Sequence, residues 1–150
     1  MKVLVINGPN INLLGIREPE IYGDSSYCQL VSLVQEEAER LGIWAQFFQS
    51  NCEGALVDAV QQAHGVFDGL IINPAAYTHT SIALLDALKA VGLPAVEVHI
   101  SDPAARDEFR KTSYIAPACI ATVKGKGLAG YVEALHLLVE KLKAAPGEKA

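Results

Sequence analysis

Hydrophobic residues in this chain occur in short runs that alternate with segments in which they recur at helical spacing. Most of the short runs are bounded by Gly or Pro, and such runs are typical of buried strands. The pattern therefore predicts strands at Lys2–Ile6, Ile43–Gln49, Gly69–Asn73, Ala95–His99 and Cys119–Val123.

Helices are predicted between and after these strands. Ser26 and Gln29 have the spacing of a capping box at the start of the first helix. Its apolar face comprises Leu30, Val31, Leu33, Val34, Ala38 and Leu41. The others are about Ala55–His64, a segment after Ser81 that carries Leu84, Leu85 and Leu88, and about Leu128–Lys143 with a stripe of Tyr131, Leu135, Leu138, Val139 and Leu142.

The alternation of strand and helix along the whole chain predicts an α/β fold. A parallel sheet with helices on both faces, a three-layer sandwich, buries the apolar side of every element. Five strands favour the flavodoxin-like order 2-1-3-4-5. A chain of 150 residues is one domain by size, so we expect a single domain over residues 1–150, with a frayed tail at 144–150.

Polar loops follow the first, third and fourth predicted strands, which are neighbours in this order. Ligands of open α/β sheets bind beyond the carboxyl ends of the strands, near the point where the strand order reverses. The first loop, Asn7–Gly23, is long and has no regular hydrophobic period, and such loops are often functional. We expect it to meet the loops Asn73–Ser81 and Glu97–Asp102 at a binding site, as a movable lid.

The composition of the chain excludes several classes of partner and location. The net charge is −5, which argues against a nucleic-acid or anionic-membrane partner. No apolar run reaches the eighteen or so residues that span a bilayer, and the N-terminus enters a strand without a signal-peptide pattern. The 3 cysteines are widely spaced and form no CxxC pair, which indicates reduced thiols and a cytoplasmic location.

His99 is the first candidate for acid–base chemistry, because imidazole titrates near neutral pH. Glu97 lies two residues earlier on the same predicted strand, so both side chains share one face of the sheet. A carboxylate in that position can orient the ring or keep it protonated, as a general acid requires.

Tyr22 is the second candidate, although tyrosine is a poor base near pH 7. Lowering its pKa by about two units requires roughly 2.7 kcal/mol of preference for the phenolate. A guanidinium about 4 Å away supplies on the order of 4 kcal/mol at an effective dielectric constant near 20. Arg17, in the same loop, is the cation we expect there.

Taken singly, these residues also have structural interpretations. A histidine at the end of a strand is more often hydrogen-bonded than catalytic, and Asn10 and Asn73 can simply stabilise turns. His79 can act as a local cap. Arg106 and Arg110 lie among acidic residues and can form a solvated charged segment.

Considered together, the motifs match a known family. Over about residues 3–143 the chain resembles the type II 3-dehydroquinate dehydratases in the order and spacing of these blocks. They are Asn7-Gly8-Pro9-Asn10, Leu13-Leu14-Gly15, Arg17-Glu18-Pro19, Tyr22-Gly23, Gln49-Ser50-Asn51, Glu53-Gly54, Asn73-Pro74, Tyr77-Thr78-His79-Thr80-Ser81, Glu97-Val98-His99-Ile100-Ser101, Arg106, Phe109-Arg110 and Ser113-Tyr114.

The resemblance implies reversible dehydration of 3-dehydroquinate to 3-dehydroshikimate through an enolate, in the shikimate pathway of aromatic amino-acid biosynthesis. It implies no metal and no organic cofactor, and self-association as a homododecamer, a tetramer of trimers. The same reaction also serves catabolic quinate use, and the residues do not separate the two roles.

The resemblance also assigns roles by position. Tyr22 would remove the proton alpha to the ketone and Arg17 would lower its pKa, while Asn10 would hold a water that stabilises the enolate. His99, backed by Glu97, would protonate the departing hydroxyl. The substrate itself would be held by Asn73, His79, Ile100, Ser101 and Arg110, and by Asp86 from a neighbouring subunit.

Departures from the family pattern lie near these positions. Leu85 stands where an Arg usually precedes the helix Asp, which bears on the subunit contact of Asp86. Asp102 stands where Asn is usual, and we expect its carboxylate to point away from the substrate carboxylate.

Two other interpretations stay open. One is a lyase or aldolase that forms a Schiff base, with Lys124 or Lys126 after the last strand reaching the edge of the site. The other is a non-catalytic flavodoxin-like module that binds a nucleotide or flavin. The first loop does not have the GxGxxG spacing that a dinucleotide site requires.

Overall fold

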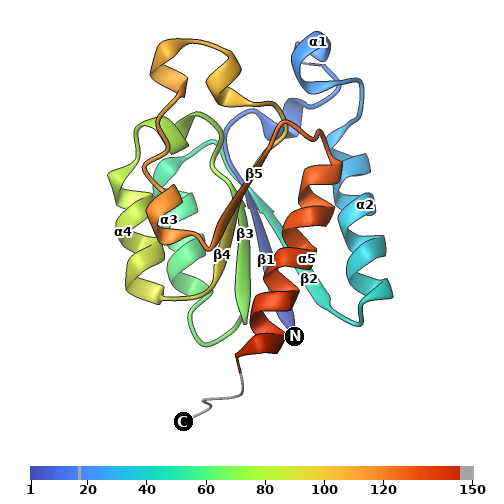
Figure 1. Ribbon diagram of the computed structural model, residues 1–150, viewed down its shortest axis with the longest axis vertical. Coiled ribbons are helices and arrows are strands. Elements are labelled where there is room, and N and C mark those ends of the chain that lie inside the picture. The colour runs from blue at the N-terminus through green and yellow to red at the C-terminus, as the bar shows by residue number, and fades with distance from the viewer. Residues whose placement is uncertain (17, 146–150) are drawn as a thin grey trace.

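A five-stranded parallel sheet forms the centre of the protein, in the order β2-β1-β3-β4-β5 (Figure 1). The computed structural model describes residues 1–16 and 18–145. The strands are β1 (Lys2–Asn7), β2 (Trp44–Gln49), β3 (Gly69–Asn73), β4 (Ala95–His99) and β5 (Ala121–Lys124). The predicted order 2-1-3-4-5 and the α/β class are therefore confirmed.

Four longer helices cover the two faces of the sheet. One face is covered by α2 (Tyr27–Arg40) and α5 (Ala129–Ala144), and the other by α3 (Glu53–Gln62) and α4 (Ile82–Val91) (Figure 1). Alternate residues of β1 face opposite layers: Val3 and Val5 pack under α2 and α5, whereas Leu4 and Ile6 pack under α3 and α4. This alternation gives the sandwich a hydrophobic core on each side of the sheet.

The first helix begins as its sequence predicts. The Ser26 N–H donates to Gln29 Oε1 at 2.7 Å, and the Gln29 N–H donates to Ser26 Oγ at 3.2 Å, which completes the capping box. The predicted stripe of α2 is wrong at Leu33, whose side chain is exposed. Leu30, Val34 and Ala38 form the buried face, because these positions are three or four residues apart.

The last predicted strand starts two residues too early. Ala116–Ala118 form a 3-10 turn (η5), and the Cys119 N–H donates to Ala116 O at 3.0 Å. Pairing with β4 begins only at Ala121, opposite Val96. At the other end of the chain α5 ends at Ala144, and residues 146–150 of the expected frayed tail lie outside the described residues.

Short helices gather beyond the carboxyl ends of the strands, at the top of Figure 1. They are η1 (Ile11–Leu13), α1 (Pro19–Tyr22), η2 (Ala75–His79), η3 (Pro103–Ala105) and η4 (Glu108–Arg110). Single turns of this length are too short to show a hydrophobic period, so the sequence does not predict them. Among the described residues, no helix is both long and apolar enough to span a membrane.

Candidate active site

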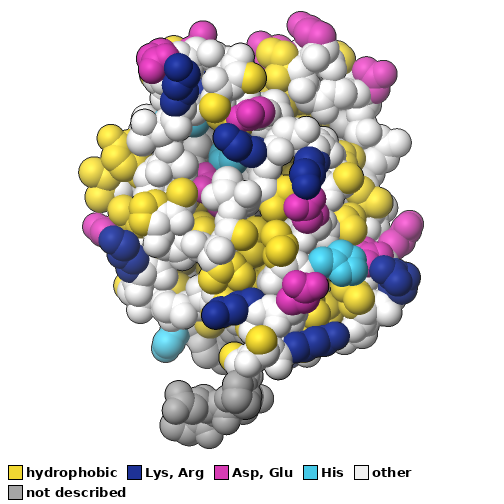
Figure 2. Space-filling model, in the orientation of Figure 1, with side chains coloured by type: hydrophobic (Ala, Val, Ile, Leu, Met, Phe, Trp, Pro, Cys, Tyr) yellow, Lys and Arg dark blue, Asp and Glu magenta, His cyan; other side chains and the backbone are white. Residues whose placement is uncertain are grey.

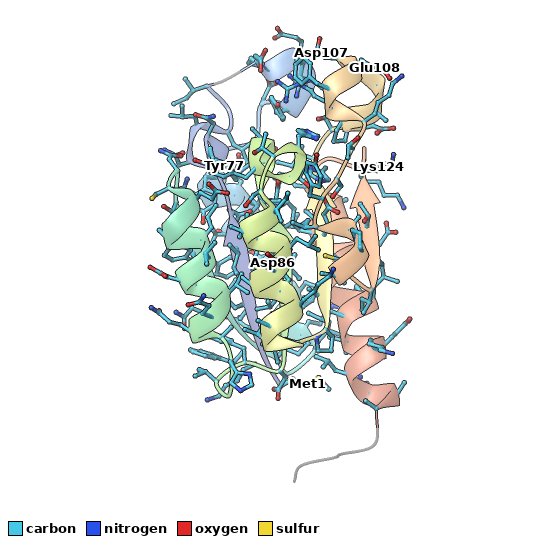
Figure 3. The ribbon with its side chains drawn as sticks, turned by 90° about the vertical axis from the view of Figure 1, so that its left-hand side faces the viewer. Met1, Tyr77, Asp86, Asp107, Glu108 and Lys124 are labelled. Carbon is cyan, nitrogen blue, oxygen red and sulfur yellow. The ribbon has the colours of Figure 1, made fainter. Side chains whose placement is uncertain are left out.

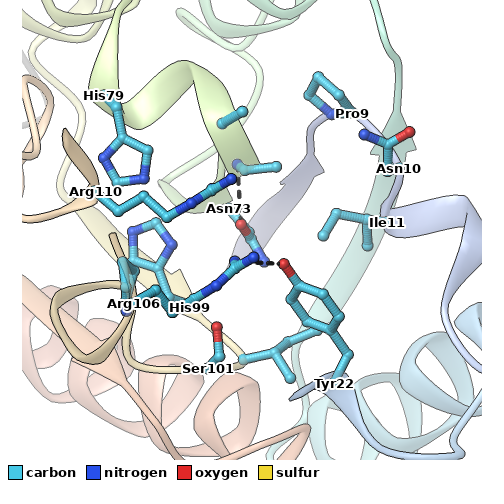
Figure 4. Close-up of a pocket in the computed structure, with 14 residues that line it drawn as sticks. Pro9, Asn10, Ile11, Tyr22, Asn73, His79, His99, Ser101, Arg106 and Arg110 are labelled. Atoms are coloured by element: carbon cyan, nitrogen blue, oxygen red, sulfur yellow. Dashed lines mark hydrogen bonds between the residues drawn. The ribbon is translucent and has the colours of Figure 1, made fainter. Parts of the chain in front are cut away.

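A pocket lies where the loops after β1, β3 and β4 meet, at the predicted edge of the sheet (Figure 4). The lid residue Tyr22 and residues of the β4–β5 connection close its sides. The pocket is lined by Pro9, Asn10, Ile11, Tyr22, Asn73, Ala75, Ala76, His79, His99, Ile100, Ser101, Pro103, Arg106 and Arg110.

His99 is the last residue of β4, and its ring is hydrogen-bonded to the buried carboxylate of Glu97. His99 Nε2 lies 2.6 Å from Glu97 Oε1, and the Glu97 side chain has no exposed surface. The two residues lie on the same face of β4 because they are two positions apart. A buried carboxylate at this distance fixes the orientation of the imidazole.

Three hydroxyl groups surround the Glu97 carboxylate. Thr78 Oγ1 donates to it at 2.5 Å, Ser113 Oγ at 2.8 Å and Thr122 Oγ1 at 3.3 Å. Burial by itself would raise the pKa of Glu97. The hydrogen bond and charge of His99, with the Thr78 and Ser113 hydroxyls, outweigh burial and hold that pKa below its usual value. Glu97 is therefore a carboxylate at neutral pH, and it accepts a hydrogen bond from the ring.

Tyr22 ends the short helix α1 and is paired with Arg106 from the β4–β5 connection. Arg106 Nη1 donates to the Tyr22 hydroxyl at 2.7 Å, and its guanidinium carbon lies 5.6 Å from the centre of the ring (Figure 4). The interpretation of Arg106 as part of a solvated charged segment is therefore wrong. Arg17, the cation expected from the sequence, lies outside the described residues.

Asn73, His79 and Arg110 present polar atoms along the wall of the pocket. The Asn73 amide nitrogen donates to the Tyr131 hydroxyl at 2.8 Å, and its oxygen accepts from the Ala75 N–H at 3.1 Å. His79 Nδ1 lies 2.7 Å from Thr112 O. His79 is not the cap of α4, since that role belongs to Ser81, whose hydroxyl accepts from the Leu84 N–H.

The loops after β1 and β3 are pressed together. The Gly8 N–H donates to Asn73 O at 2.8 Å, and a Cβ atom at Gly8 would lie 2.5 Å from Pro74 O. Two residues later Asn10 has a left-handed backbone (φ 68°), and its N–H donates to Asn51 Oδ1 at 3.0 Å. This close approach places the start of the loop after β1 directly against the turn that follows β3.

Comparison with known proteins agrees with this architecture. Residues 1–139 match the family described as dehydroquinase class II. The chain belongs to this family.

Two curated relatives of this class II dehydroquinase are named 3-dehydroquinate dehydratase. The relative from Caldicellulosiruptor saccharolyticus is 52% identical, covering 94% of this chain and 98% of its own. The relative from Clostridium perfringens is 51% identical, covering 95% of this chain and all of its own. The type II dehydroquinase structure from Butyrivibrio crossotus has a TM-score of 0.91 at 47% identity, covering 93% of this chain and 97% of that chain.

The structure brings most of the predicted site residues of this class II dehydroquinase to one pocket. Those in its lining are Asn10, Tyr22, Asn73, His79, His99, Ile100, Ser101 and Arg110. Glu97 lies behind His99. Asp86 is exposed on α4 and is not among the described residues that line its own chain's pocket (Figure 3).

Arg106 is the site residue that reasoning from single positions missed. It lies 84 residues from Tyr22 in the sequence, and its acidic neighbours resemble those of a surface segment. The available signal was its place in the connection after strand four, beside Arg110, in a block that matches the family.

The structure also places Asp102, which departs from the family pattern, and the two lysines of the Schiff-base interpretation, Lys124 and Lys126. The Asp102 carboxylate accepts from the Ala104 N–H at 3.0 Å and lies 3.2 Å from Lys124 Nζ. It is outside the pocket lining, as expected. Lys126 pairs with Glu133 at 2.6 Å. Since neither lysine is among the described residues of the lining, the pocket gives the Schiff-base interpretation no support.

Proposed function

We propose that this protein is a 3-dehydroquinate dehydratase, a hydro-lyase that converts 3-dehydroquinate reversibly to 3-dehydroshikimate through an enolate. The observation that carries the proposal is a pair of potential acid–base groups in one pocket, each hydrogen-bonded to a charged partner. Tyr22 is paired with a guanidinium and His99 with a buried carboxylate. The names and identities of the relatives support the choice of substrate.

The first step would remove the proton alpha to the substrate ketone. The Tyr22 phenolate would take this proton, because the Arg106 guanidinium stabilises negative charge on the phenol oxygen. The electrons of the C–H bond would form an enolate, whose oxygen needs a hydrogen-bond donor. A water held at Asn10 would supply that donor. Arg17 would add a second cation on the lid.

The second step would expel the hydroxyl group. The enolate would re-form the ketone as the carbon–oxygen bond breaks, and His99 would give its proton to the leaving oxygen, so that water departs. Glu97 would stabilise the imidazolium before this step and keep the ring in place. Tyr22 then holds the proton that His99 lacks, and exchange with solvent would restore both groups for the next turnover.

The remaining pocket residues would bind and orient the substrate. The backbone of Ile100 and Ser101 with the Ser101 hydroxyl would hold the carboxylate, while Asn73, His79 and Arg110 would hold the hydroxyl groups. Closure of the lid loop over them would exclude water during proton transfer. Acid–base groups of the protein suffice for every step, so the proposal includes no metal or organic cofactor.

We further propose a homododecamer built as a tetramer of trimers, a cytoplasmic location and a biosynthetic role in the shikimate pathway. Exposed apolar side chains lie on α4 and between β4 and β5, where a neighbouring subunit can cover them: Ile82, Tyr114 and Ile120. A neighbour docked there would bring its own Asp86 toward a site.

The decisive experiment adds 3-dehydroquinate to the purified protein and follows the ultraviolet absorption of the conjugated enone product. We expect turnover by the natural sequence and almost none by Tyr22→Phe or His99→Ala, with circular dichroism unchanged. His64→Ala, at an exposed histidine outside the pocket lining, is the control and should turn over normally. Near-normal rates in Tyr22→Phe or His99→Ala would refute the role of that residue.

A further inference from the structure

A buried chain of polar side chains lies directly beneath the pocket and joins three elements of the fold. The Tyr131 hydroxyl, on α5, donates to Asn7 Oδ1 at 2.6 Å, and the Asn73 amide nitrogen donates to the same hydroxyl at 2.8 Å. Asn7 and Asn73 end β1 and β3, where they are paired in register. Tyr131 and Asn7 are fully buried, and Asn73 is 2% exposed.

The Ala75 N–H and the Tyr131 hydroxyl together hold the Asn73 amide in one orientation. The Asn73 side-chain oxygen accepts from the Ala75 N–H at 3.1 Å, so the amide nitrogen must face the Tyr131 hydroxyl. Because the hydroxyl accepts from Asn73, its own proton goes to Asn7. Burial raises the pKa of Tyr131, so the hydroxyl keeps that proton over the working pH range.

This arrangement determines what Asn73 offers to a ligand. One N–H of its amide is used by Tyr131, and the side-chain oxygen is used by Ala75. Asn73 lines the pocket, and its second N–H is therefore the donor left for a substrate oxygen. Rotation of the amide by 180° would present an oxygen instead, which would repel a carboxylate or the lone pairs of a hydroxyl.

We propose that Tyr131 is a positioning residue for substrate binding, which holds the Asn73 amide as a donor toward the pocket without touching the substrate. The inference rests on the proposed function for the identity of that substrate. In this proposal α5, which contributes buried side chains to the hydrophobic core, also supports the pocket. The Tyr131 hydroxyl on this helix acts on the Asn73 amide through one buried hydrogen bond.

A double-mutant cycle tests this inference. Steady-state kinetics with 3-dehydroquinate are measured for the natural sequence, Tyr131→Phe, Asn73→Ala and the double variant. We expect Tyr131→Phe to raise KM about five- to tenfold, the effect of one hydrogen bond, with kcat within about threefold. In the Asn73→Ala background the same change should have no further effect, because its target is gone. Multiplicative effects, or an unchanged KM in Tyr131→Phe, would overturn the inference.

Val139→Ala is the matched control on the same helix. It removes buried methyl groups about two turns from Tyr131 and should lower the thermal midpoint while leaving KM unchanged. If Tyr131→Phe fails to fold, Asn7→Ala takes its place. That variant frees the hydroxyl proton, lets the amide turn and should raise KM in the same direction. An unchanged KM there contradicts the inference.

A second measurement separates this inference from the proposed function. If the natural sequence showed no turnover, the proposed function would be refuted. The orientation of the Asn73 amide could still be tested by crystallography. High-resolution structures should show one Asn73 rotamer in the natural sequence and more than one in Tyr131→Phe. A single, unchanged rotamer in both would overturn the role of Tyr131.

Discussion

The contact between Arg106 and Tyr22 is the residue pair on which the proposed base depends. A phenol becomes a base at neutral pH only where a cation favours its ionised form. Arg106 reaches the hydroxyl from the β4–β5 connection, whereas Tyr22 belongs to the lid. The hydrogen bond between the two side chains therefore depends on the position of α1 beside the pocket.

Substitution of Arg106 should reduce catalysis without unfolding the protein. We expect Arg106→Ala to lower kcat/KM by about 10²–10³, corresponding to about 3–4 kcal/mol of lost electrostatic stabilisation. Arg106→Lys should retain part of the rate because it keeps the charge. Arg40→Ala, an exposed arginine on α2, is the control. An unchanged kcat/KM in Arg106→Ala would contradict this role.

The buried Glu97 links stability to pH. Its folded pKa is lowered, so it contributes stability above its unfolded pKa, near 4.3, and loses that contribution as pH falls through the folded value. We expect Glu97→Gln to be less stable near neutral pH and to show a flatter loss of stability below about pH 4.5. Urea unfolding at a series of pH values measures both. Glu140→Gln, exposed on α5, should follow the natural sequence. Parallel curves for Glu97→Gln and the natural sequence would be inconsistent with this linkage.

At the scale of elements, the site is formed by loops that leave parallel strands at one edge. Their positions depend on how closely the backbones approach. Gly8 after β1 lies against Pro74 after β3, at a separation that leaves no space for a side chain. A glycine here serves close packing, since its backbone does not adopt a positive φ.

Gly8→Ala should therefore separate these two loops. We expect a loss of about 1–3 kcal/mol of unfolding free energy, as for other overpacked sites, together with a raised KM because Asn10 and Asn73 move apart. Urea unfolding and steady-state kinetics measure the two effects. Gly54→Ala is the control, since a Cβ there would meet only Cys52 Sγ, at an ordinary van der Waals distance of 4.0 Å, and it should be neutral or stabilising in α3. Normal stability and KM in Gly8→Ala would show that the loops accommodate the methyl group.

At the scale of the whole molecule, the net charge bears on binding to polyanions, and the exposed apolar side chains bear on the proposed self-association. On the face in Figure 2, Lys and Arg side chains lie among Asp and Glu side chains. The net charge of −5 offers little attraction for polyanions. The apolar side chain of Ile82 and the carboxylate of Asp86 are both exposed on α4, where the proposed self-association would place a neighbouring subunit.

Complementation between variants tests the shared site. Asp86→Ala should reduce turnover although Asp86 lies outside its own chain's pocket. Co-expressed with Tyr22→Phe, it should regain partial activity, because a subunit with an intact Tyr22 can then receive Asp86 from its neighbour. Light scattering of the natural sequence should give a mass near that of twelve chains. Full activity of Asp86→Ala, or failure of the mixture to exceed its parents, would exclude the shared site.

The sequence by itself determined the five strands, the four longer helices, the strand order and the end of the sheet at which the pocket lies. Strand runs, the helical period and the capping box of Ser26 act over a few residues, so their signals are local and readable. Parallel strands then bring the loops that carry Asn10, Asn73 and His99 to one edge. The one-turn helices and the start of β5 show no hydrophobic period. The sequence therefore does not predict these helices, and it places the start of β5 two residues too early.

Only the tertiary structure decided how the chemical groups are paired. Arg106 meets Tyr22 across 84 residues of sequence, and Tyr131 meets Asn73 across 58. The hydroxyls around Glu97 come from separate segments of the chain. Such contacts form between side chains that local periodicity leaves unrelated, and packing alone sets their distances. The lowered pKa of Glu97 and the orientation of the Asn73 amide therefore follow from the folded molecule.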